Sequence, residues 1–200
     1  SGDLVSSIRI KNGNFRLEDY RRSEKPFITA LEKMDVVIDD LSLRKSGWVE
    51  ANGDIILNDI RSPLRMSGYI KAGDTTPFWN RAHYELQVNI NDLATDVLSQ
   101  RFRRLIPAQI HGRTNIDLKV AGTPVEGLDF NSVLTGRDLG IKLPNRAQPI
   151  LSNRITVTGT WQNIERFHKF SGLDIKFGNI RLRGETNFSL EGDDPEIRLQ

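Results

Sequence analysis

The sequence predicts an all-β protein: an antiparallel sheet of many short strands, curled into a groove or an open barrel, with one or two short helices. The first observation is an alternation of apolar and polar side chains, with a period of two, along most of the chain. Side chains on a strand point alternately to opposite faces, so the pattern indicates one apolar and one polar face. The second observation is that Gly, Asn, Asp and Pro recur between the alternating runs, as turns require.

Composition limits the possible functions. The chain has 200 residues, which suits one all-β domain or two small ones. Its 28 basic and 26 acidic residues nearly balance, and this argues against nucleic acid as the main partner, because phosphate binding needs a basic excess on one face. The absence of cysteine excludes disulfides, cysteine-ligated zinc, iron–sulfur clusters and thiol nucleophiles. No apolar run approaches the ~20 residues of a membrane helix.

Two hairpins closed by Asn-Gly turns are predicted near the N-terminus. Asn12-Gly13-Asn14 joins strands at 8–11 and 15–18, and Asn52-Gly53 joins strands at 48–51 and 54–57. Asn-Gly between alternating runs is the strongest short hairpin signal. The other strands expected in this half of the chain are 34–38, 40–44, 64–68, 69–72 and 82–90.

The alternation breaks after residue 90, where a helix is predicted. Asn91 or Asp92 can cap a helix that runs through Arg104 and ends before Pro107. Its arginines near the C-terminal end suit the helix dipole.

Strands resume in the C-terminal half, with one ambiguous segment. Residues 161–170 are predicted as a short helix, because Ile164 and Phe167 have helical spacing and Ser171-Gly172 can stop it. The predicted strands are 112–121, 128–135, 138–143, 154–159, 173–177, 179–184 and 186–191. Prolines 63, 77, 107, 124, 144, 149 and 195 fall between predicted strands, as sheet pairing requires.

A weak internal echo links the two ends of the chain. "IRIKNGNFRLED" near the start resembles "LDIKFGNIRLRGE" near the end. Any hairpin with a glycine turn could look like this, but the shared Lys-x-Gly-Asn-x-Arg-Leu string favours a repeated strand unit.

The order of several strings resembles the AsmA-like superfamily of diderm bacterial envelope proteins. The resemblance spans most of the chain, and the string at 112–124 carries most of it. The strings, in order, are "IRIKNGNFRLED", "DVVIDDLSLR", "SGYIKAG", "LQVNINDLATDVLSQRFRRLIP", "IHGRTNIDLKVAGTP", "DLGIKLPNR", "ITVTGTW" and "LRGETNFSLEGDDPEIRLQ".

The resemblance implies a function in the cell envelope. Such proteins are anchored in the inner membrane by an N-terminal helix, and their periplasmic part is a curled sheet of repeats around a hydrophobic groove. They are implicated in phospholipid transport between membranes or in outer-membrane biogenesis. Residues 1–200 would then be one β-rich segment of a longer, membrane-anchored protein, with both ends cut from it. The expected partners are phospholipid acyl chains and envelope proteins that the sequence does not identify.

The candidate lipid-contacting residues are the apolar members of the longest alternating runs. A groove lined by such side chains could hold acyl chains without specific polar contacts. They are Leu86, Val88, Ile90, Ile116, Leu118, Val120, Leu139, Ile141, Leu143, Leu173, Ile175 and Phe177.

A closed β-sandwich is the alternative, because two apolar faces can cover each other and need no ligand. The alternation is the same in both cases. A closed sandwich would suit a binding or adhesion module, for example one for carbohydrate with Trp48, Trp79 or Trp161 as a sugar platform. Tryptophans among strands more often fill the core or an edge.

No catalytic or metal-binding constellation is apparent, so the chain is predicted not to be an enzyme and to need no cofactor. His83, His111 and His168 are isolated. The pairs Asp39-Asp40 and Asp193-Asp194 suit turns better than a calcium site. Nucleophile-elbow and phosphate-loop motifs are missing. There are two basic clusters, at 101–104 and at Arg21, Arg22 and Lys25. The first could meet a membrane surface or an acidic partner, although a helix C-terminus with a solvated face is the favoured explanation.

Overall fold

One antiparallel sheet contains nearly all of the described backbone. The computed structural model describes residues 7–19, 27–40, 46–73, 81–97, 109–142, 147–164, 167–189 and 196–199. Within them the sheet has twelve strands, and a short helix occupies residues 95–97. The two edges do not pair with each other, so the sheet is open. The predicted all-β, curled antiparallel fold is confirmed.

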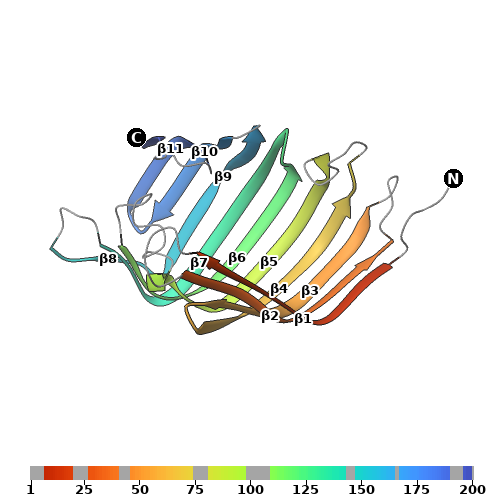
Figure 1. The fold of residues 1–200 in the computed structure, drawn as a ribbon. Helices are drawn as coiled ribbons and strands as arrows, with labels where there is room; N and C mark the ends of the chain where they lie inside the picture. Colours follow the sequence, from red (N-terminus) through yellow and green to blue (C-terminus); the bar gives the residue numbers. More distant parts are fainter. Residues whose placement is uncertain are drawn as a thin grey trace.

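The strands follow one another along the sheet in chain order (Figure 1), so that nearly every strand pairs with its sequence neighbours. The short β8 is the exception: it pairs only with β7, and β9 then returns to the other part of β7. The strands are β1 (Ser7–Asp19), β2 (Phe27–Asp39), β3 (Gly47–Leu57), β4 (Ile60–Lys71), β5 (His83–Ala94), β6 (Gln109–Thr123), β7 (Gly127–Lys142), β8 (Ile150–Leu151), β9 (Arg154–Ile164), β10 (Phe167–Phe177), β11 (Ile180–Ser189) and β12 (Glu196–Leu199).

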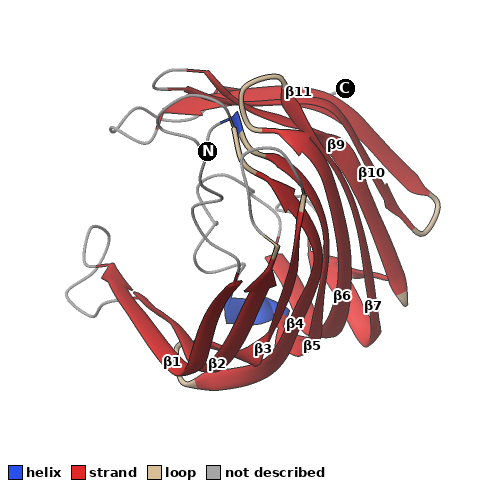
Figure 2. Ribbon diagram, turned by 90° about the vertical axis from the view of Figure 1, so that its right-hand side faces the viewer, coloured by secondary structure: helices blue, strands red, loops and turns tan. Residues whose placement is uncertain are grey.

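The long strands bend, and the sheet becomes a half-pipe. Figure 2, in which the β1 end faces the viewer, shows the strands curving so that the sheet has a concave side. The ladders shift register near the middle of β1, β2 and β10, near the end of β5 and near the start of β6. Asn12, Lys33 and Asp92 have φ of 53°, 52° and 56° at three of these shifts, and Gly172 has φ of 59° at another. Such β-bulges bend a strand and increase its twist, so they account for the curvature.

The two predicted Asn-Gly hairpins are wrong. β1 continues through Asn12-Gly13-Asn14 without reversing direction, and β3 continues through Asn52-Gly53 in the same way. Glycine at these positions instead allows other atoms of the sheet to approach the backbone closely. A Cβ on Gly53 would lie 2.3 Å from the Met34 sulfur and 2.9 Å from the Glu32 carbonyl oxygen, so no side chain fits opposite the β2 bulge.

The observed strands are longer than predicted, because several predicted neighbours are parts of one strand. Segments 64–68 and 69–72 both belong to β4, apart from residue 72, which follows the strand. Segments 128–135 and 138–143 both belong to β7, apart from residue 143, which lies outside the described residues. Pro63 lies within β4 and not between strands. The β4–β5 ladder ends at the adjacent pair Leu64 and Ile90, so the missing N–H leaves no β4–β5 bond unmade.

The echoed strings fold differently. The C-terminal copy forms a hairpin in which Phe177 pairs with Ile180 around Gly178-Asn179, with φ of 55° at Gly178. The N-terminal copy is a bulge inside β1. Similarity of the strings therefore does not make them repeated structural units.

Both predicted helices are corrected. β5 continues to Ala94, where Leu93 and Ala94 pair with Thr114 and Arg113, and the helix begins only at residue 95; residues 98–104 lie outside the described part. Segment 161–170 is not helical, because β9 reaches Ile164 and β10 starts at Phe167. The helical spacing was misleading there, since it spans a chain reversal.

Burial is concentrated in two small clusters on this single layer. The first contains Leu57, Leu93, Ala94 and Val97, and the second contains Leu139, Ile155 and Phe177. No second sheet packs on the described strands, so the closed sandwich is not the architecture of this part of the chain.

Candidate functional site

Cross-strand register gathers the apolar side chains into rows that follow the length of the half-pipe. The longest row crosses ten strands and holds Ile10, Val36, Ala51, Met66, Val88, Leu118, Ser132, Val157, Ile175 and Leu182. Ser132 is its only polar member. With neighbouring strands ~4.8 Å apart, the row spans about 40 Å.

A parallel row starts at Leu64 and ends at Ile180. Between them it holds Ile90, Ile116, Leu134, Ile155 and Phe177. The two rows are separated by two residues along each strand, so they lie on the same face. One continuous apolar surface therefore runs from β1 to β11.

This surface is the inner face of the half-pipe. Figure 2 shows the helix at 95–97 on the inner side of the curve. Val97 of that helix packs with Leu57 and Leu93, and Ile90 and Ile116 pack against the same cluster. Apolar side chains thus line the interior, and the charged side chains of the same strands point outward.

The structure brings most of the predicted groove residues together. Leu86, Val88 and Ile90 of β5 pair with Val120, Leu118 and Ile116 of β6. All six are only half-buried.

The remaining predicted groove residues are more deeply placed. Ile175 lies in the longest row, and Leu173 is half-buried two residues away. Leu139 and Phe177 are 0% and 3% exposed, so they form packing that a ligand cannot reach, and Ile141 packs against them. Leu143 lies outside the described residues.

The apolar face becomes more exposed towards the β1 edge. Ile10 and Leu17 are 48% and 53% exposed, and Phe15 is 61% exposed. Nothing in the described part of the chain covers these side chains.

Aromatic side chains occur on both faces. Phe130 packs edge-on to Phe170 with ring centroids 6.0 Å apart, and Trp161 stacks on His168 at 5.7 Å, all on the inner face. Trp48 and Tyr69 form an edge-on pair on the outer face. Trp48 stays 38% exposed in this pair, and Trp79 lies outside the described residues.

The outer face is stabilised by ion pairs. Arg61 donates to Asp54 (2.5 Å) and Glu32 (2.8 Å), which raises the pKa of its guanidinium. Arg181 donates to Asp174 through two nitrogens, and this hydrogen bonding holds the pKa of Asp174 below its ordinary value. These contacts tie neighbouring strands together on the side that faces water.

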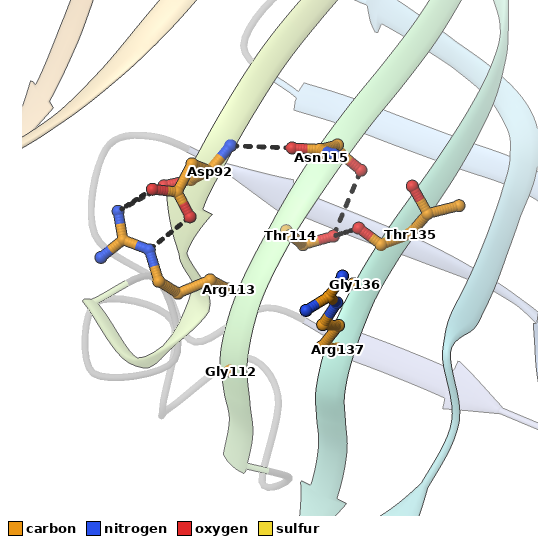
Figure 3. Close-up of a pocket in the computed structure, with 8 residues that line it drawn as sticks. All are labelled: Asp92, Gly112, Arg113, Thr114, Asn115, Thr135, Gly136 and Arg137. Carbon is orange, nitrogen blue, oxygen red and sulfur yellow. Dashed lines mark hydrogen bonds and ion pairs between the residues drawn. The ribbon is translucent and has the colours of Figure 1, made fainter.

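Figure 3 shows an outer-face pocket that sequence reasoning missed. It has a volume of about 570 Å³ and lies where β5, β6 and β7 bulge. Its residues are Asp92, Gly112, Arg113, Thr114, Asn115, Thr135, Gly136 and Arg137. The alternating pattern could not reveal it, because the pocket depends on the register shifts and not on the residue types.

The histidines and acidic residues considered above do not form a metal site in the described part of the chain. The described residues contain no group of three His, Cys, Asp or Glu side chains suited to a metal. His83 Nε2 lies 3.4 Å from Glu85 Oε1, and the His168 ring stacks on the Trp161 ring. Asp40 follows the last residue of β2 and has φ of 59°, as expected of a turn residue. Both basic clusters and Asp193-Asp194 lie outside the described residues.

Comparisons with protein-family models, curated proteins and solved structures give no match for this chain. Among the described residues, no helix is both long and apolar enough to cross a membrane.

Proposed function

We propose that the inner face of the half-pipe binds the acyl chains of phospholipids. The chain would act as a periplasmic segment of an AsmA-like protein, anchored in the inner membrane by a segment outside these 200 residues, in phospholipid transport or outer-membrane biogenesis. The observation that supports the proposal best is the row of about 40 Å, apolar except for Ser132, on a concave face that no second sheet covers among the described strands. Adhesion, the alternative function, stays an untested prediction.

The energetics favour hydrocarbon as the occupant. Each methylene that leaves water contributes roughly 0.8 kcal/mol, so ten methylenes contribute about 8 kcal/mol before the cost of ordering the chain. The rows offer almost no hydrogen-bonding groups that would select a polar ligand or fix one position. An acyl chain could therefore slide along the groove, while its headgroup stays in water on the open side.

The test introduces a charge into the middle of the longest row. Leu118→Asp places a carboxylate between Val88 and Ser132, and the Ser132 hydroxyl can donate to it, so the sheet should survive. Ile141 is less suitable, because it packs on the buried Leu139. Asn131→Asp adds the same charge to the outer face beside Lys119 and serves as the matched control.

Binding of a phosphatidylethanolamine with a fluorescent acyl chain reports the result. We expect Leu118→Asp to weaken binding at least tenfold and Asn131→Asp to bind like the parent chain, with circular dichroism showing a folded sheet in all three. Equal binding by the parent chain and Leu118→Asp, or no binding by the parent chain, would contradict the proposal.

A further inference from the structure

The outer-face pocket belongs to a different surface from the groove. Arg113, Asn115, Thr135 and Arg137 alternate with Thr114 and Gly136 along β6 and β7. Thr114 is 1% exposed, and its hydroxyl donates to the Thr135 carbonyl oxygen at 3.1 Å. The four alternating side chains therefore point to the outer face, away from the apolar rows (Figure 3).

Asp92 holds Arg113 in a fixed orientation. Arg113 Nε donates to Asp92 Oδ1 at 2.5 Å, and Nη2 donates to Asp92 Oδ2 at 2.7 Å and to its carbonyl oxygen at 2.8 Å. A guanidinium has five N–H donors, and these contacts use three. Within the described residues, the two N–H groups of Nη1 remain for a ligand.

Asn115 is fixed in a similar way. Its Oδ1 accepts the N–H of Asp92 at 2.9 Å, which directs the side-chain amide across the bulge. The two N–H donors of Asn115 Nδ2 are therefore left over. The Thr135 hydroxyl lies on the paired position of β7, directly opposite Asn115.

Positive charge accumulates around these donors. Arg137 pairs directly with Arg113 across the β6–β7 ladder, and Arg154 pairs with Thr135 from β9. No described side chain forms an ion pair with Arg137 or Arg154. Three arginines and one aspartate give a local charge of 3 − 1 = +2, and like charges placed directly opposite destabilise a sheet unless an anion compensates them.

We infer that this pocket binds a phosphate group. A phosphate monoester carries close to two negative charges at neutral pH, which balances the local charge. Its oxygens can accept from the Arg137 fork, Arg113 Nη1, Asn115 Nδ2 and the Thr135 hydroxyl, which are more donors than a carboxylate can use. The phosphate can belong to a soluble molecule or to a lipid headgroup at a membrane surface.

Titration of the whole chain with inorganic phosphate, followed by proton–nitrogen correlation spectra, tests the soluble source. We expect saturable shifts of the Asn115 side-chain amide and the Arg113 Nε–H signal. Arg137→Gln should weaken the affinity at least tenfold, because it removes a charge-assisted fork. Arg65→Gln is the matched control, since Arg65 is an exposed arginine on the outer face of β4, away from the pocket.

Flotation with phosphatidylcholine vesicles that contain phosphatidic acid tests the lipid source. Binding in either arm that depends on Arg137 and not on Arg65 supports the inference and identifies the source. Absence of binding in both arms, or equal losses in Arg137→Gln and Arg65→Gln, would overturn it. The result is independent of acyl-chain binding, because neither variant changes the inner face.

Discussion

Three residues with positive φ have their backbone N–H groups satisfied by side chains from the neighbouring strand. The N–H of Asn12 donates to Asp35 Oδ1 at 2.9 Å, and that of Lys33 donates to Asn14 Oδ1 at 3.0 Å. The N–H of Asp92 donates to Asn115 Oδ1 in the same manner. A bulge leaves a residue without its ladder partner, and these side chains replace the missing acceptor.

The exposed carboxylates make stability depend on pH at the residue scale. Hydrogen bonds from Arg181 hold the folded-state pKa of Asp174 below its ordinary value of 3.8, and Arg113 does the same for Asp92. A carboxylate with a lowered folded-state pKa stabilises the fold above its ordinary pKa, and this contribution disappears as pH falls through the folded-state value. Asp174→Asn should therefore destabilise the fold at neutral pH but have little effect at strongly acidic pH.

Urea midpoints at neutral pH and well below pH 3.8 check this expectation. Asp117→Asn is the control, because Asp117 accepts only a 3.4 Å hydrogen bond from Gln87 and has no arginine partner in the described part of the chain. If Asp174→Asn and Asp117→Asn lower the urea midpoint by the same amount at both pH values, the Arg181 contact does not contribute through charge.

Bulges determine the shape of the elements. The β1 and β2 bulges stabilise each other: Asp35 of β2 accepts a hydrogen bond from the β1 bulge, and Asn14 of β1 accepts one from the β2 bulge. Asn14→Ala removes an acceptor from Lys33 N–H and should cost about 1 kcal/mol of unfolding free energy. Asn131→Ala, on an exposed position of β7, should stay within about 0.5 kcal/mol of the parent chain.

Equilibrium urea unfolding of both variants measures the difference. Indistinguishable midpoints for Asn14→Ala and Asn131→Ala would mean that water replaces the side-chain cap without loss.

The sequence predicted the kind of element well and its ends poorly. The alternation at 82–90 and at 112–121 identifies strands and their apolar faces, because that signal is local. Asn12-Gly13 carries a local hairpin signal too, but pairing with the distant β2 decides its conformation and turns it into a bulge. The outer-face pocket depends on two such register shifts, in the β5–β6 and β6–β7 ladders, which no local pattern reports.

The described strands form a single layer with an apolar inner face. Almost every strand pairs only with its neighbours in the chain, so the half-pipe is close to one-dimensional, and no second sheet among the described residues covers its inner face. The alternation of apolar and polar residues could not decide between an open groove and a closed sandwich, because both produce the same pattern. The central claim is that hydrocarbon, and not another protein layer, occupies the interior.

Site-specific photo-crosslinking tests this claim most directly. The chain has no cysteine, so Leu118→Cys or Asn131→Cys can carry a single benzophenone on the inner or the outer face of the same region. We expect illumination with phospholipid vesicles to attach acyl chains to the Leu118→Cys protein and not to the Asn131→Cys protein, as mass spectrometry of the intact chain would show. Equal labelling of both proteins, or no lipid adduct on the Leu118→Cys protein, would contradict the account.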